Sequence, residues 1–170
     1  MSSTGLITSM FRYKAWANGE ILAAIRQLDE QAHATERHAA MRILNHTYVV
    51  DRIFAANLRG TPHEYTATNT IETPELEQLS FAIGASDKSY IDYVTELGPD
   101  DLVESVDFTF TDGDAGRMSR GEMLTHVIVH GAYHRGAVGR IMAELSISPP
   151  RDVFTGYLHR AEAAARRRLP

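Results

Sequence analysis

Apolar residues recur every three to four positions along most of the chain, and this spacing is typical of amphipathic helices. It predicts four long helices at about residues 5–28, 35–58, 73–97 and 119–145, and a shorter C-terminal helix at about 152–168. Glycine followed closely by proline, at Gly60 and Pro62 and again at Gly98 and Pro99, is typical of a helix end. Four long helices with little strand indicate an all-α protein built as a four-helix bundle.

Local signals mark the beginnings of the third and fourth helices. Thr73-Pro74-Glu75 places a capping residue before a proline and an acid, and Ser119-Arg-Gly-Glu122 is a capping box. Between these helices, residues 105–111 alternate polar and apolar side chains, and Asp112-Gly113-Asp114 is typical of a turn. We therefore expect a short β-hairpin or an extended loop before the fourth helix.

The second and fourth helices carry histidine on their apolar stripes. The stripe of the second helix contains Ile43, His46, Val50, Ile53 and Asn57. The stripe of the fourth contains Met123, Val127, His130, His134, Val138, Ile141 and Leu145. An imidazole buried without a partner is costly, so each of these histidines needs a partner in the core.

His46, His130 and His134 are the candidate metal ligands. Residues four apart lie on one face of a helix, so His130 and His134 can reach one point, and His46 can approach it from the second helix. Three imidazoles suit zinc, nickel or a similar divalent ion, and they leave coordination positions open. The alternative is that these are ordinary core histidines bonded to tyrosine or backbone carbonyls.

The remaining histidines are assigned other roles. His126 lies one turn before His130, but a single ion cannot serve both ends of the series from 126 to 134, which spans about 12 Å along the axis. We expect His126 to support the ligands or pack in the core. We expect four others, in loops or near helix ends, to face solvent: His33, His38, His63 and His159.

Other polar and aromatic residues on these helices have less specific interpretations. Asp51 points away from the ligand face, and we expect it to pair with Arg135. Trp16 is expected to anchor the core, and Asn18 to cap or cross-link helices. Three tyrosines are alternatively pocket donors or core residues, with packing as the expected role: Tyr13, Tyr48 and Tyr133.

Composition and charge narrow the function. The 170 residues fit one domain over residues 1–170, with 44% apolar and 23% charged residues. The net charge of −5 argues against nucleic-acid binding, and the basic run 166–168 is interpreted as a solvated helix end. With no cysteine, the chain has no disulfide, cysteine metal ligand or cysteine nucleophile. It shows no signal peptide and no apolar run that could span a membrane, so we expect a soluble cytoplasmic protein.

Three motifs resemble those of the DinB-like (DinB/YfiT) family of metal-dependent four-helix-bundle proteins. They are Tyr13-Lys-Ala-Trp16-Ala-Asn18, then Leu44-Asn45-His46 with Asp51-Arg52, and His126-Val-Ile-Val-His130-Gly-Ala-Tyr-His134-Arg135-Gly136. Pro149-Pro150 before the last helix also fits. The chain departs from the family pattern at Val129 and Ala137, neither of which is a candidate ligand.

The resemblance implies an up-down-down-up bundle, a homodimer, and a divalent metal held by His46, His130 and His134. Some members of the wider superfamily are transferases or isomerases that use low-molecular-weight thiols. Since this chain has no cysteine, a thiol nucleophile would have to come from a bound co-substrate.

We therefore expect a metal-dependent transferase or hydrolase that acts on a small molecule, with a low-molecular-weight thiol as a candidate co-substrate. The sequence indicates no general base, and no catalytic residue is assigned. The alternative is a non-catalytic protein that binds a metal or a small ligand in a stress response.

Overall fold

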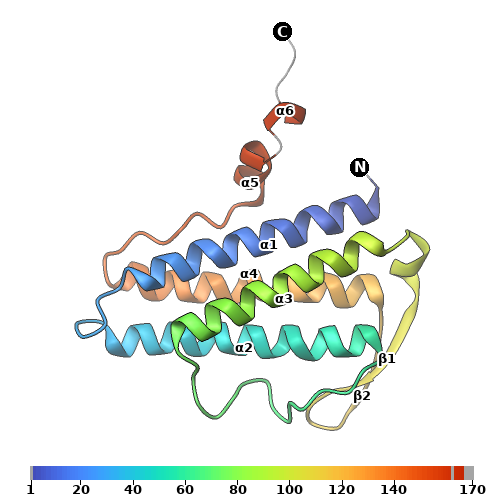
Figure 1. Ribbon diagram of the computed structural model, residues 1–170, viewed down its shortest axis with the longest axis horizontal. Coiled ribbons are helices and arrows are strands. Elements are labelled where there is room, and N and C mark those ends of the chain that lie inside the picture. The colour runs from blue at the N-terminus through green and yellow to red at the C-terminus, as the bar shows by residue number, and fades with distance from the viewer. Residues whose placement is uncertain (1, 162, 167–170) are drawn as a thin grey trace.

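The computed structural model describes residues 2–161 and 163–166, and it confirms a mostly helical protein. Its elements are α1 (Ser3–Arg26), α2 (Ala34–Arg59), α3 (Leu76–Glu96), a short 3₁₀ helix (Asp100–Val103), β1 (Ser105–Thr109), β2 (Ala115–Ser119), α4 (Arg120–Glu144), α5 (Phe154–Ala161) and α6 (Ala163–Arg166). The four long helices form the bundle, and the predicted hairpin precedes α4 (Figure 1).

The direction of the helices is up-down-down-up, as the resemblance implied. In Figure 1, α1 and α4 run one way, and α2 and α3 run the other way. The antiparallel pairs α1–α3 and α2–α4 make the most extensive helix contacts. The connection over residues 60–75 is long because it must return the chain along the whole bundle before α3 begins parallel to α2.

The predicted helix signals hold at α4 and fail at α3. Ser119 and Glu122 form both halves of the capping box. However, α3 begins at Leu76 with Glu75 as its cap, so Pro74 is not the first helical residue. The Arg42 guanidinium on α2 donates to the backbone carbonyl of Thr70, so the segment before α3 is bonded to α2.

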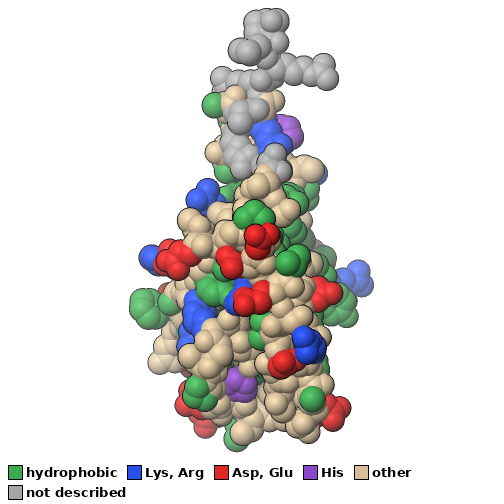
Figure 2. Space-filling model, turned by 90° about the vertical axis from the view of Figure 1, so that its right-hand side faces the viewer, with side chains coloured by type: hydrophobic (Ala, Val, Ile, Leu, Met, Phe, Trp, Pro, Cys, Tyr) green, Lys and Arg blue, Asp and Glu red, His purple; other side chains and the backbone are tan. Residues whose placement is uncertain are grey.

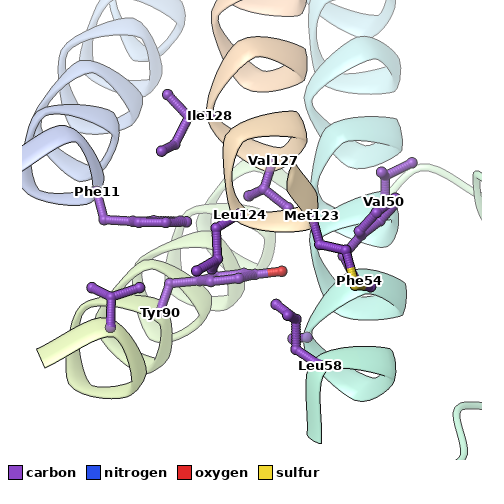
Figure 3. Packing of buried hydrophobic residues seen from close by; sticks show 11 residues of the cluster. Phe11, Val50, Phe54, Leu58, Tyr90, Met123, Leu124, Val127 and Ile128 are labelled. Atoms are coloured by element: carbon purple, nitrogen blue, oxygen red, sulfur yellow. The ribbon is translucent and has the colours of Figure 1, made fainter. Parts of the chain in front are cut away.

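Two apolar cores occupy the two halves of the bundle. In the half shown in Figure 3, the rings of Phe11 and Tyr90 stack with centroids 4.9 Å apart. Side chains from α2 and α4 pack around them, including Phe54 and Met123. The second core contains Ile25, Leu44, Leu79, Val138 and Met142, among others. On each long helix, buried polar residues lie between the residues of the first core and those of the second. We call this set, together with Asp51, the polar layer; it includes Lys14, Asn18, Asn45, Asp87 and Arg135, and it crosses the middle of the bundle.

The hairpin and the C-terminal segment lie outside the bundle. Ser105 pairs with Ser119 in the antiparallel hairpin, whose Phe108 ring lies 6.1 Å from that of Phe54 on α2. Helices α5 and α6 extend away from the bundle beyond α1 (Figure 1). Within the predicted helix at 152–168, residues 154–161 and 163–166 are helical, and residues 162, 167 and 168 of that prediction lie outside the described residues.

Charges of both signs are distributed over the end of the bundle seen in Figure 2. Acidic and basic side chains intermingle on that face, and no continuous basic patch is visible there. None of the described helices combines the length and apolar character needed to cross a membrane.

Candidate metal centre

Three histidine side chains from α2 and α4 converge within the polar layer. The Nε2 atom of His130 lies 3.1 Å from Nε2 of His46 and 3.1 Å from Nε2 of His134. One ligand atom from each of the three histidines lies within 4.8 Å of the others. The structure therefore brings together the three residues selected from the sequence, because α2 and α4 are packed neighbours and His134 is one turn from His130.

A backbone carbonyl fixes the tautomer of His46. Its Nδ1 lies 2.7 Å from the carbonyl oxygen of Thr68, which can only accept a hydrogen bond. The proton of neutral His46 is therefore on Nδ1, and Nε2 presents a lone pair to the other two histidines. This arrangement, a ring nitrogen bonded to a carbonyl and the other nitrogen free, is the usual one for a metal-binding histidine.

The three Nε2 atoms cannot all form hydrogen bonds among themselves. Neutral His130 has at most one proton on Nε2, so it can donate to His46 or to His134 but not to both. A tetrahedral zinc ion with Zn–N bonds of about 2.0–2.1 Å separates its nitrogen ligands by about 3.3 Å. The two distances from Nε2 of His130 are close to this value, and the ligand atoms of all three histidines lie within 4.8 Å of one another, so the donor set fits a divalent cation.

Burial favours the uncharged forms of His130 and His134. It lowers the pKa of His130 to about 3, and the neighbouring His134 and His46 contribute to the shift. Burial also lowers the pKa of His134, with His46 as the second cause. Since a metal ion binds only neutral imidazole, both shifts favour the form that can act as a ligand.

The lowered pKa of His130 predicts a pH dependence for the metal-free protein. Below about pH 6.5 the unfolded chain takes up a proton on His130 that the folded state does not, so stability falls as the pH falls toward 3. Urea unfolding should show a steeper loss of stability between about pH 7 and pH 5 for the wild type than for His130→Gln. Exposed His38 gives the control, because His38→Gln should leave the slope unchanged. Equal slopes in wild type and His130→Gln would contradict the prediction.

His126 lies beside the cluster but outside it. Its ring stacks on that of Phe54 at 4.6 Å and on that of His130 at 5.2 Å. It therefore packs against one face of His130, which agrees with the supporting role expected of it. Of the four histidines expected to face solvent, His38 and His159 are exposed.

The other two, His33 and His63, are partly exposed and therefore face solvent only in part. The His63 ring packs beside Tyr65, with centroids 6.2 Å apart, because the long connection after α2 lies along the helix.

The predicted pairing of Asp51 with Arg135 is wrong. Asp51 instead accepts from the Lys14 ammonium at 2.6 Å, and the same ammonium bonds Asp87 at 2.7 Å. Lys14 is fully buried, with a side-chain exposure of 0%. Arg135 turns toward the C-terminal segment and pairs with Asp152 at 2.8 Å.

The carboxylates and the lysine of this layer influence one another. Burial disfavours charged Lys14, but Asp51 and Asp87 outweigh it and raise the pKa of Lys14. Burial raises the pKa of Asp51 to about 6, and Lys14 opposes this only in part. The lysine therefore stays charged and is the cation that both aspartates depend on.

Asn18 cross-links helices, as predicted. Its amide nitrogen donates to Asp87 on α3 at 2.8 Å, and its carbonyl oxygen accepts from Arg135 on α4 at 3.0 Å. Tyr13 is buried and donates to Asp152, and burial together with this bond raises the pKa of Tyr13 to about 12. The α1 motif from Tyr13 to Asn18 therefore joins α1 to α3, to α4 and to the C-terminal segment.

Two of the aromatic predictions are wrong. Trp16 is half-buried rather than a core anchor, because its ring faces α5, 5.6 Å from the ring of Tyr157. Tyr133 is 75% exposed, with only an edge contact to His134. Tyr48 is partly buried against the second core, which agrees with a packing role.

Sequence reasoning missed Lys14, Asp87 and Thr68. A signal for Lys14 was present, since it falls on the apolar stripe that includes Phe11 and Ile21, where a charge needs a partner. No comparable signal exists for Thr68, which acts through its backbone carbonyl.

Comparison with known proteins agrees with the geometry. The family model described as the DinB family matches residues 1–168. No curated protein matches the chain. With a family model that covers nearly its whole length, this chain belongs to the DinB family.

Proposed function

We propose that this protein binds one divalent metal ion, zinc or nickel, through the Nε2 atoms of His46, His130 and His134. The observation that carries the proposal is the convergence of three Nε2 atoms that cannot all be satisfied by hydrogen bonds among themselves. Membership of the DinB family supports it.

Three protein ligands leave coordination positions for water or substrate. A bound divalent ion would supply Lewis acidity and would lower the pKa of a coordinated water or thiol. Thr68 holds the ring of His46 in place, and Phe54 with His126 covers one side of His130 and limits the access of water there.

We place substrate entry on the side where α2 meets the hairpin. A cavity of about 50 Å³, which has room for water molecules or a small substituent, lies there, lined by Val50, Ile53 and Asn57 of α2, by Thr68, and by hairpin residues such as Phe108. The Asn57 Nδ2 is buried and lacks a hydrogen-bond partner among the described residues. It is available to donate to a substrate that carries an oxygen acceptor.

The reaction we propose is a metal-dependent transfer or hydrolysis of a small molecule. A low-molecular-weight thiol is the candidate co-substrate, and its sulfur would come from outside because the chain contains no cysteine. The homodimer that the family resemblance implies is part of this proposal, and sedimentation analysis checks it.

Metal analysis of the purified protein tests the site. We expect about one zinc or nickel ion per wild-type chain, and none in the double variant His46→Ala/His130→Ala, because a single remaining imidazole binds weakly. The matched control is His126→Ala, which changes a histidine of the same helix but should retain the metal. Loss of metal from His126→Ala as complete as from the double variant would contradict the ligand assignment, and so would metal-free wild type.

A non-catalytic metal- or ligand-binding protein is the second candidate. The composition of the cluster favours this candidate. Among the described residues, the cluster consists of histidines alone and contains no carboxylate that could act as a base. Screening thiols with small electrophiles separates the two candidates. Turnover that disappears with the metal supports the enzyme, and activity that survives metal removal would contradict the metal-dependent reaction.

A further inference from the structure

A second cavity lies between α1, α4 and the segment that leads into α5. Its volume is about 310 Å³, which is at the lower end of the range found for small-molecule sites. Trp16 and Ile21 of α1 form one wall, and Pro149 and Pro150 form another. Gly136 of α4 also lines the cavity, and a Cβ added there would meet no atom within 4 Å.

This cavity is separate from the histidine cluster. None of its lining residues belongs to α2, whereas the histidines lie between α2 and α4. Gly136 and Gly139 are about 200° and 140° around the α4 axis from His134, so they face the other side of the helix. A molecule in the cavity would therefore not touch a metal held by the histidines.

The cavity has apolar walls and charged side chains of both signs at its edge. Arg135, Arg140 and Arg151 line it against two acids, Glu20 and Asp152. Arg135 is bonded to Asp152, and Arg140 pairs with Glu144 in an exposed ion pair. The guanidinium of Arg151 is exposed and has no ion-pair or hydrogen-bond partner among the described residues.

These features define the chemistry of an occupant. Apolar walls with an indole favour an aromatic body, since aromatic rings pack well against one another. Outside the two ion pairs, the edge carries the exposed acid Glu20 and the unpaired cation Arg151. The guanidinium of Arg151 favours a negative charge beside it, and arginine matches the geometry of a carboxylate. We propose that this cavity binds a small aromatic carboxylic acid, with its ring beside Trp16 and its carboxylate at Arg151.

The test uses Trp16, which is the only tryptophan in the chain. Its indole N–H gives a single resonance in a ¹H–¹⁵N correlation spectrum, and 4-phenylbutyrate is the probe. We expect a saturable shift of this resonance with a Kd below about 1 mM, and the same shift in chelator-treated protein because the cavity is separate from the histidines. The neutral amide, 4-phenylbutyramide, should bind roughly tenfold more weakly.

Matched variants locate the binding. Gly136→Leu fills the cavity and should abolish the shift, whereas Gly84→Leu, on an exposed and equally open position of α3, should not change it. Arg151→Gln should weaken binding roughly tenfold, whereas Arg12→Gln, at an exposed position outside the cavity, should not.

Four results would overturn the proposal. The first is no shift at about 5 mM probe, and the second is equal binding of acid and amide. The third is an indole shift that depends on protein concentration and not on the probe, which would assign the cavity to a contact between copies of the chain. Binding that disappears only on metal removal would place the probe at the histidines instead, and would contradict the separate site while supporting the proposed function.

Discussion

Replacing Lys14 with methionine should lower the free energy of unfolding by about 3–5 kcal/mol, which is among the largest effects expected from one substitution. Among the described residues, Lys14 is the only cation in an ion pair with Asp51, and it also pairs with Asp87. Methionine fills the space of the aliphatic chain but leaves two carboxylates, only 4% and 5% exposed, without their cation. Urea unfolding monitored by circular dichroism measures the change.

Two further variants show whether charge is the cause. Lys88 forms an exposed ion pair with Asp92 on α3, so Lys88→Met should change stability by at most about 0.5 kcal/mol. The triple variant Lys14→Met/Asp51→Asn/Asp87→Asn removes the stranded charges and should recover part of the loss. If Lys14→Met were as mild as Lys88→Met, the buried ion network would not contribute as described.

Divalent metal should stabilise the folded protein by about 4 kcal/mol when free metal is about 1,000 times its Kd. The reason is that the three imidazoles are assembled only in the folded state, so binding energy adds to folding energy. A series of thermal or urea unfolding curves over a zinc or nickel titration of chelator-treated protein gives the size of the effect.

His134→Ala tests whether this stabilisation comes from the cluster. It should remove most of the effect, because two ligands remain, while His38→Ala, at an exposed position on α2, should keep it in full. An unchanged metal effect in His134→Ala would mean that the ion binds elsewhere.

The elements most accurately predicted from the sequence are those governed by local interactions. The capping box at Ser119 and the hairpin turn at residues 112–114 depend on neighbours a few residues away, and both are found. The predicted start of α3 was wrong, and the segment before this helix is bonded through Thr70 to Arg42, more than 25 residues earlier. Such a contact leaves no mark in the local pattern.

The metal centre could be predicted because its signal is periodic. His130 and His134 share a helix face at any tertiary arrangement, and His46 falls on the apolar stripe of a neighbouring helix. Its support could not be predicted in the same way, since the carbonyl of Thr68 lies in an irregular connection. The up-down-down-up direction of the helices was predicted only from the resemblance to the DinB family.

Sequence alone was enough for the four amphipathic helices, the capping box of α4 and the three candidate ligands, because helical periodicity and capping follow from covalent geometry and near neighbours. The partners of the buried charges depended on the tertiary structure. Asp51 had several cations within its reach in principle, and it is the packing of α1 between α3 and α4 that brings Lys14 to it and leaves Arg135 for Asp152. Pairings between helices depend on their rotation and height, and these are set by the packing of the whole core.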